Sequence, residues 1–206
     1  MEKKRKGANA REAGFCVCGG DFAVDFVNTR VCVRGVRVEL LHSLEDVAAW
    51  LERAGKREAL TDGIDTLAPD KRREVYLRIM ELRDRMEEVF AAMVKGEDLP
   101  GGFVDYLNGQ LESYAGHDRL VRQGTSWAVE RRYPAAHLPA LFLEETARFV
   151  ASMDPKRLKA CENKACILYF YDTSRNRQRR WCSMDTCGNR MKASRHYHRR
   201  KAHRPL

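Results

Sequence analysis

Residues 161–190 read CENKACILYFYDTSRNRQRRWCSMDTCGNR, and the four cysteines of this stretch decide how the C-terminal part of the chain folds. Cys161 and Cys166 form one C-x4-C pair, Cys182 and Cys187 form a second, and fifteen residues separate the two pairs. Two such pairs around a hairpin-sized insert can place four thiolates at the corners of a tetrahedron, as in structural zinc sites. The spacing therefore predicts one Zn²⁺, and the alternative is a set of isolated thiols. Four thiolates leave no open coordination position, so this zinc would be structural and not catalytic.

The segment around these cysteines has few large apolar side chains, so residues 155–206 are expected to lack a core of their own. Zinc binding would supply the missing free energy of folding, which is about 10 kcal/mol in zinc-finger peptides. We expect a strand at residues 167–171 beside the first pair, with Trp181 packed against it. Gly188 would allow the tight turn after the last ligand.

The same segment is strongly basic. Residues 155–206 contain 15 Lys and Arg and three acidic residues, a balance of +12, whereas the whole chain carries +9, so residues 1–154 sum to −3. A basic end on a mildly acidic body indicates a polyanionic partner, and the alternative is a solubilising tail. A helix from Asn189 would place Lys192, Arg195 and Arg199 on one face, where they can follow a phosphate backbone. The candidate nucleic-acid contacts are Arg175, Arg177, Arg179, Arg180, Arg190, Lys192, Arg195, Arg199 and Arg200.

The rest of the chain predicts a helical body. Apolar residues at steps of three and four predict a long helix at residues 70–95, and the same periodicity predicts helices after Ser43, at residues 103–114 and up to residue 152. The stripe on the long helix could be a dimer seam but fits an ordinary core better. Valines at positions 31, 33, 36 and 38 around Arg34-Gly35 predict a hairpin in an extended region at residues 15–41, and residues 120–133 could form a second hairpin.

The predicted fold is therefore mainly α with one or two short β-hairpins. A basic arm at residues 1–14 lacks an apolar face and is expected to be disordered. A multihelical domain follows at residues 15–154, and Asp154-Pro155 separates it from a small four-cysteine zinc-finger module with a basic tail at residues 155–206. Asp25, Asn28 and Thr29 lie together in one short segment, where they could cap a helix and bind turn amides or could line a small-ligand pocket.

Cysteine number and hydropathy indicate the compartment. Seven cysteines without a secretory signal argue against a disulfide framework, so the thiols are expected to be free or bound to metal. Cys16, Cys18 and Cys32 remain outside the quartet, and a redox or second-metal role for Cys16-x-Cys18 is the less favoured interpretation. No apolar run is long enough to span a membrane, so we expect a cytoplasmic protein without a membrane partner.

The quartet and its surroundings resemble a known zinc-binding family. Residues 170–176 (FYDTSRN), 180–184 (RWCSM) and 187–190 (CGNR) are similar to the CGNR zinc finger. Residues 20–29 (GDFAVDFVNT) resemble the start of the ABATE-type domain that precedes this finger in a group of bacterial proteins. The resemblance implies zinc ligation by Cys161, Cys166, Cys182 and Cys187, and the family is described as stress-induced transcription regulators.

These observations favour a DNA-binding transcriptional regulator. Its zinc module would present arginines and lysines to double-stranded DNA, and the N-terminal body would sense a small-molecule effector or form a homodimer. The alternative is a zinc-stabilised RNA-binding or protein-interaction module without a DNA operator. An enzyme is not expected, because the chain shows no nucleophile and base pattern, no phosphate-binding glycine loop and no metal ligand set with an open position.

Overall fold

The computed structural model describes residues 14–114 and 116–202, together with their side chains other than those of residues 196 and 198–202. Apart from Gly14, the predicted disordered arm at residues 1–14 lies outside the described residues. Within the described part of the chain, no helix is both long enough and apolar enough to cross a membrane.

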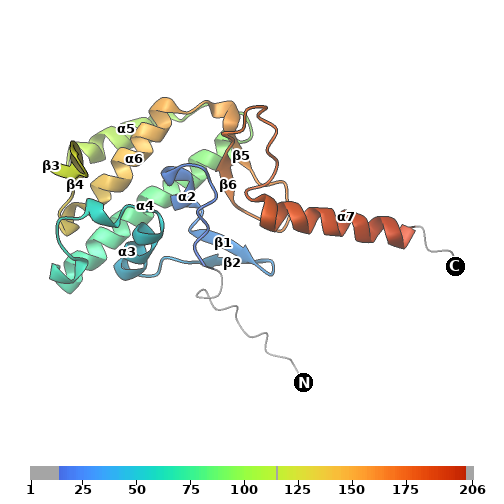
Figure 1. The fold of residues 1–206 in the computed structure, drawn as a ribbon, viewed down its shortest axis with the longest axis horizontal. Helices are drawn as coiled ribbons and strands as arrows, with labels where there is room; N and C mark the ends of the chain where they lie inside the picture. Colours follow the sequence, from blue (N-terminus) through green and yellow to red (C-terminus); the bar gives the residue numbers. More distant parts are fainter. Residues whose placement is uncertain (1–13, 115, 203–206) are drawn as a thin grey trace, which may run out of the picture.

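A helical body forms around the long helix α4, Pro69–Met93, which contacts α2, Phe22–Val27, α3, Leu44–Arg53, and α6, Leu138–Ser152 (Figure 1). Helix α5, Gly101–Leu111, packs on α6. Short 3-10 turns join these helices at Arg57–Ala59, Ile64–Thr66 and Ala135–His137, and a fourth at Pro155–Arg157 follows α6. The predicted mainly α fold is confirmed.

Helix boundaries follow local signals. The hydroxyl of Ser43 accepts a hydrogen bond from the Asp46 N–H and caps α3, and Gly55 follows the helix with φ at 70°. The predicted stripe on α4 is buried in the core of this chain, so it is not a dimer seam. Its members are Val75, Ile79, Leu82, Met86, Val89 and Met93.

Aromatic rings fill the centre of the body. Trp50 is fully buried, and its ring lies 5.0 Å from Phe22, 5.6 Å from Phe26 and 5.8 Å from Phe142, measured between centroids. These rings come from α2, α3 and α6, so burying their apolar surface is what holds the three helices together.

The expected extended structure at residues 15–41 is wrong for residues 22–27, which form helix α2. The carboxylate of Asp21 accepts a hydrogen bond from the Ala23 N–H and caps this helix. Residues 23–27 are all buried because α2 lies between α4, α6 and the C-terminal module. A short apolar run that is buried on every side has no helical periodicity to detect, which is why the pattern suggested a strand.

Three two-stranded antiparallel sheets complete the fold. Strands β1, Arg30–Val33, and β2, Val36–Glu39, form the predicted hairpin, and its turn residues Arg34 and Gly35 both have positive φ, at 53° and 82°, as a type I′ turn requires. Strands β3, His117–Gln123, and β4, Ser126–Arg132, form the second predicted hairpin. In the C-terminal module, β5, Leu158–Ala160, pairs with β6, Tyr169–Tyr171, where a single strand was expected.

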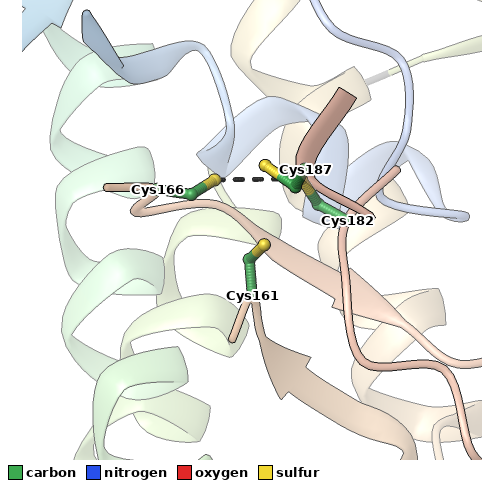
Figure 2. Close-up of side chains that lie close together, drawn as sticks. All are labelled: Cys161, Cys166, Cys182 and Cys187. Atoms are coloured by element: carbon green, nitrogen blue, oxygen red, sulfur yellow. Dashed lines mark hydrogen bonds between the residues drawn. The ribbon is translucent and has the colours of Figure 1, made fainter. Parts of the chain in front are cut away.

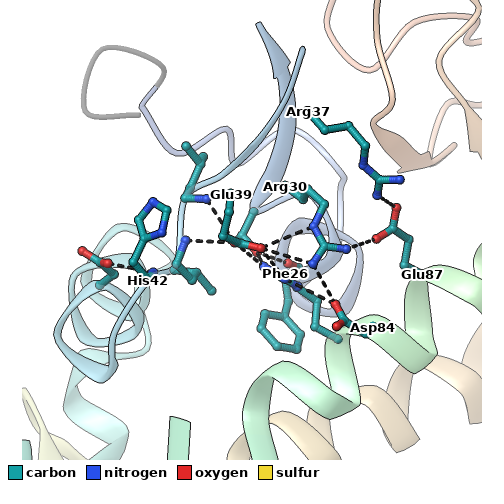
Figure 3. A network of polar contacts seen from close by, with 12 residues as sticks. Phe26, Arg30, Arg37, Glu39, His42, Asp84 and Glu87 are labelled. Atoms are coloured by element: carbon teal, nitrogen blue, oxygen red, sulfur yellow. Dashed lines mark hydrogen bonds and ion pairs between the residues drawn. The ribbon is translucent and has the colours of Figure 1, made fainter. Parts of the chain in front are cut away.

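An ion pair between a buried arginine and a half-buried glutamate holds the β1–β2 hairpin on α4. The guanidinium of Arg83, whose side chain is 1% exposed, donates to both carboxylate oxygens of Glu39 at 2.6 and 2.5 Å. Arg30 lies beside this pair and contacts Glu39, Asp84 and Glu87 (Figure 3). Burial would raise the pKa of Glu39, but hydrogen bonds from Arg83 and the Leu41 N–H hold it below its usual value.

Strand β6 is the seam between the body and the C-terminal module. The Asn28 side chain donates to the Tyr169 carbonyl and accepts from the Tyr169 N–H, each at 2.9 Å, as a neighbouring strand would. The Tyr171 N–H donates to the Gly19 carbonyl at 2.6 Å. Gly20 has φ at 86°, and a Cβ there would come within 3.0 Å of the Tyr171 carbonyl oxygen, so this close approach requires glycine.

Candidate metal centre and nucleic-acid surface

The four predicted ligand cysteines converge on one point. Their sulfurs all lie within 4.8 Å of one another, with 3.8 Å between Cys166 and Cys182 and 3.7 Å between Cys182 and Cys187 (Figure 2). A tetrahedron with Zn–S bonds of about 2.3 Å has its sulfurs about 3.8 Å apart. The arrangement therefore fits one zinc ion with four thiolate ligands.

Two short turns place the ligand pairs. After β5, Cys161 donates its N–H to the Leu168 carbonyl, and the Cys166 N–H donates to the Asn163 carbonyl, so the first pair lies on a tight loop before β6. The second pair spans a turn at Met184–Gly188, which Ser183 caps by accepting from the Thr186 N–H. Gly188 was expected to permit a tight turn. The structure gives it another role: a Cβ at this position would overlap the Met184 sulfur, so the glycine leaves room for the Met184 side chain.

The chemistry of the cluster also favours a cation. Hydrogen bonds from the Cys166 and Cys182 thiols lower the pKa of Cys161, and donation to Cys161 raises the pKa of Cys166 and of Cys182. Four thiols this close cannot all ionise without a positive charge among them, and a divalent metal supplies it. The amide of Asn163, which is buried, donates to the Cys187 sulfur at 3.3 Å and would orient this ligand.

The core of the zinc module is shared with the N-terminal part of the chain. Leu168 and Phe170 pack with three of the ligand cysteines, but also with Val31 and Leu40 at the open end of the β1–β2 hairpin, away from its turn. Phe15, Val33 and Val38 lie against the same cluster. The module was expected to depend on zinc because it lacks a core, and the structure shows that residues far upstream supply much of that core.

Cys16 and Cys18 form a disulfide, so the expectation that all thiols are free or metal-bound is wrong for these two. Both pack against the cluster that contains the zinc ligands. Cys32 is a free thiol, half-buried in β1, and does not belong to the ligand set.

The arginines of the loop between the pairs lie in different surroundings. Arg179 is half-buried, donates to the carbonyls of Cys18, Trp181 and Cys182, and stacks over the Phe170 ring at 4.6 Å. Arg180 pairs with Glu162, and Arg177 pairs with Asp154 at 3.1 Å. The contacts of Arg179 make it a tether between the N-terminal segment and the zinc module, whereas Arg175 is exposed.

Asp172 organises this loop, a role that the sequence analysis missed. Its carboxylate is fully buried and accepts hydrogen bonds from Lys159, from Ser174 and from the Arg179 N–H. Burial would raise the pKa of Asp172, but these hydrogen bonds hold it well below the usual value for aspartate. The signal available in the sequence was the Asp-x-Ser pattern, which is typical of turns in which an aspartate accepts from nearby amides.

The basic helix begins directly after the last ligand. Helix α7, Asn189–Ala202, confirms the predicted helix and extends away from the body (Figure 1). Arg190, Lys192 and Arg195 are exposed on it. Arg199 and Arg200 lie on the same helix, but their side chains are outside the described residues.

The polar trio near the N-terminus makes structural contacts. The carboxylate of Asp25 accepts from the N–H groups of Cys18 and Gly19 at 2.8 and 2.6 Å. Asn28 binds β6, and the Thr29 hydroxyl donates to the Phe26 carbonyl while accepting from Arg83. These contacts join α2 to the segment before it, to the zinc module and to α4.

Asp25 makes part of the stability depend on pH. Burial raises the pKa of Asp25 to about 6, and the two backbone hydrogen bonds only partly oppose this. Aspartate in an unfolded chain has a pKa of about 3.9, so the folded state holds the proton more tightly. The free energy of unfolding therefore falls as the pH rises from about 4 to about 6. Asp25→Asn keeps an oxygen acceptor but cannot titrate, so it should remove this loss. We expect the unfolding free energy of the variant, measured relative to that of wild type, to increase by about 1 kcal/mol from pH 5 to pH 7.

Urea unfolding of both proteins at pH 5 and pH 7 measures this gain. Because only the difference between the two proteins is compared, the pH dependence of zinc binding cancels. A difference in unfolding free energy that is the same at both pH values would contradict the prediction.

Comparison with known protein families accounts for most of the chain. Residues 157–200 match the CGNR zinc finger, and residues 20–153 match ABATE, the family described as "Putative stress-induced transcription regulator". No match was found among curated proteins. Because the ABATE match covers well over half of the sequence and is followed by the finger whose four cysteines converge here, the chain belongs to the ABATE family and carries a C-terminal CGNR zinc finger.

Proposed function

We propose that the protein is a transcriptional regulator that binds double-stranded DNA through helix α7 and through the exposed arginines of the loop between the two ligand pairs, Arg175, Arg177 and Arg180. The proposal assigns it no catalytic activity. The observation that carries it is the composition of α7, in which no acidic residue balances the cations. This helix contains six lysines and arginines and no acidic residue.

The helices of the body show the opposite arrangement. On α4, Arg78 pairs with Glu74 and Arg85 pairs with Glu81, and on α6 Arg148 pairs with Glu144, all at helical spacing. Such pairing is typical of a solvated surface. Neither Arg190 nor Lys192 has an ion-pair partner among the described residues, so their charge is available to an external anion.

The zinc centre positions this charge. Cys187 lies in the turn that leads into α7, so the metal would fix the first turn of the basic helix relative to the module. A rigid row of cations loses little conformational entropy on meeting a phosphate backbone. Arg179 is no longer a candidate contact in this proposal because its guanidinium is occupied within the chain.

A double substitution on α7 tests the proposal. We expect Lys192→Ala with Arg195→Ala to weaken binding to a random-sequence duplex about tenfold at moderate salt and to reduce the salt slope by about two, since each lost phosphate contact removes about 0.9 from the slope. The measurement is fluorescence anisotropy of zinc-loaded protein over a series of salt concentrations.

The matched control is Arg78→Ala with Arg85→Ala, which removes the same charge from α4 and should leave the affinity within about twofold, because screening limits the effect of distant charge. Binding that does not depend on salt would refute the proposal, as would equal losses in the two double variants. Stronger competition by a folded RNA than by the duplex would assign the surface to RNA.

The body is the proposed sensor of an effector. What supports this is a cavity of about 510 Å³ between Phe15 and the start of α3, lined by Leu40, His42 and Asp46 among others. Phe15 packs against both the body core and the zinc-module core. A ligand in this cavity would therefore touch the joint between the two parts.

A further inference from the structure

The β3–β4 hairpin exposes an unusual amount of apolar surface. Leu120, Trp127 and Val129 are 61%, 64% and 68% exposed, although their side chains are large and hydrophobic. Leu120 pairs with Val129 across the two strands, and Trp127 pairs with Arg122 in the next position of the same face. All three apolar side chains therefore lie on one face of the hairpin.

The opposite face of the hairpin is less exposed at its centre. Val121 pairs with Ala128 on that face, and both are half-buried. Strand β3 pairs with β4 alone among the described strands. We call the other side the outward face, and its six residues are Asp118, Leu120, Arg122, Trp127, Val129 and Arg131.

We propose that the outward face of the β3–β4 hairpin is a docking surface for a second copy of this chain. A contiguous apolar patch on an otherwise charged surface is typical of an interaction site. The choice of partner rests on charge. Asp118 lies at the base of β3 and Arg122 lies near its tip, with Leu120 midway between them.

A two-fold axis through the centre of the face, perpendicular to the strands, would place the tip of one hairpin over the base of the other. Leu120 and Val129 would then meet their own counterparts. Within one chain Asp118 and Arg131 already pair across the strands at 3.1 Å, and Arg131 also lies 3.6 Å from Glu144 of α6, but the side chains of Asp118 and Arg131 remain 60% and 40% exposed. Asp118 would therefore gain Arg122 of the second copy as a further partner, and Trp127 would face the guanidinium of Arg131 of the second copy, an arrangement suited to a cation–π contact. The face thus complements itself in charge as well as in hydrophobicity.

The hairpin face is small, so the dimer should be weak. We expect a dissociation constant of about 10–100 µM, in the range of transient interfaces. Sedimentation equilibrium of full-length, zinc-loaded protein without nucleic acid should show concentration-dependent association. Leu120→Asp should weaken the association at least about tenfold, because it places two carboxylates at the centre of the interface. The matched control is Val36→Asp, which changes an apolar residue of the same 61% exposure in the β1–β2 hairpin and should leave association unchanged.

A charge exchange separates loss of docking from loss of folding. Asp118→Arg alone should weaken association, because it sets two cations against each other, and adding Arg122→Asp to the same chain should restore it. A misfolded hairpin could not be rescued in this way. The proposal is overturned if the wild-type protein remains monomeric at about 200 µM or if Leu120→Asp and wild type associate equally. It is also overturned if a monomeric Trp127→Ser variant loses affinity for duplex DNA, because the face would then be a nucleic-acid contact.

Discussion

Cys182→Ser is expected to abolish stoichiometric zinc binding and to unfold the zinc module. The Cys182 sulfur lies 3.8 Å from that of Cys166 and 3.7 Å from that of Cys187, so it occupies the middle of the ligand set. A serine hydroxyl stays protonated at neutral pH and is a poor zinc ligand. Zinc binding contributes about 10 kcal/mol in finger peptides, so the loss exceeds what the remaining contacts of the module can offset.

The effect should spread in a defined direction. Val31 and Leu40 at the open end of the β1–β2 hairpin pack in the same cluster as the ligands, so this hairpin should lose protection together with β5 and β6. The aromatic centre around Trp50 lies in the other cluster and should remain protected. Hydrogen exchange by segment, together with zinc quantification, distinguishes this pattern from global unfolding.

Cys32→Ser is the matched control. Cys32 is a free, half-buried thiol outside the ligand set, so its variant should keep one zinc per chain and wild-type exchange. One tightly bound zinc in Cys182→Ser, with unchanged protection of β5 and β6, would contradict the assignment of this residue as a ligand.

Local patterns predicted most of the fold. The cap at Ser43, the stripe on α4 and the Arg34-Gly35 turn each depend on residues within a few positions of one another, where helical and strand periodicity can be read directly. The zinc ligands were found for a similar reason, since both pairs have a fixed short spacing and the fifteen-residue insert is long enough for a hairpin.

Contacts between distant segments could not be predicted in this way. Asn28 and Tyr169 are 141 positions apart, and nothing around Asn28 indicates that its amide substitutes for a strand. Arg179 looked like one more member of a basic run, but Cys18, 161 positions upstream, provides one of its carbonyl partners. The shared core of the zinc module has the same origin, because periodicity records which face of an element is buried and not what buries it.

Arg83→Ala is expected to lower the free energy of unfolding by about 1.5–3 kcal/mol, the contribution of hydrogen bonds to a charged group, because Glu39 loses its bidentate partner but keeps Arg30. Arg83 is 1% exposed and is the only partner that contacts both carboxylate oxygens of Glu39 among the described side chains. Its loss also removes the hydrogen bond to Thr29 at 3.1 Å. Since total stabilities are usually about 5–15 kcal/mol, urea unfolding should show a large shift of the midpoint.

Arg85→Ala is the control from the same helix. Arg85 is exposed and pairs with Glu81 at helical spacing, so its loss should cost less than about 1 kcal/mol. A second variant also removes the partly buried carboxylate. Arg83→Met combined with Glu39→Gln should recover part of the stability lost in Arg83→Ala, because a neutral amide costs less to bury than a carboxylate that has lost its bidentate partner, and it can still accept from the Leu40 and Leu41 N–H groups. Equal stabilities of Arg83→Ala and Arg85→Ala would mean that the β1–β2 hairpin is held on α4 by its apolar contacts and not by this pair.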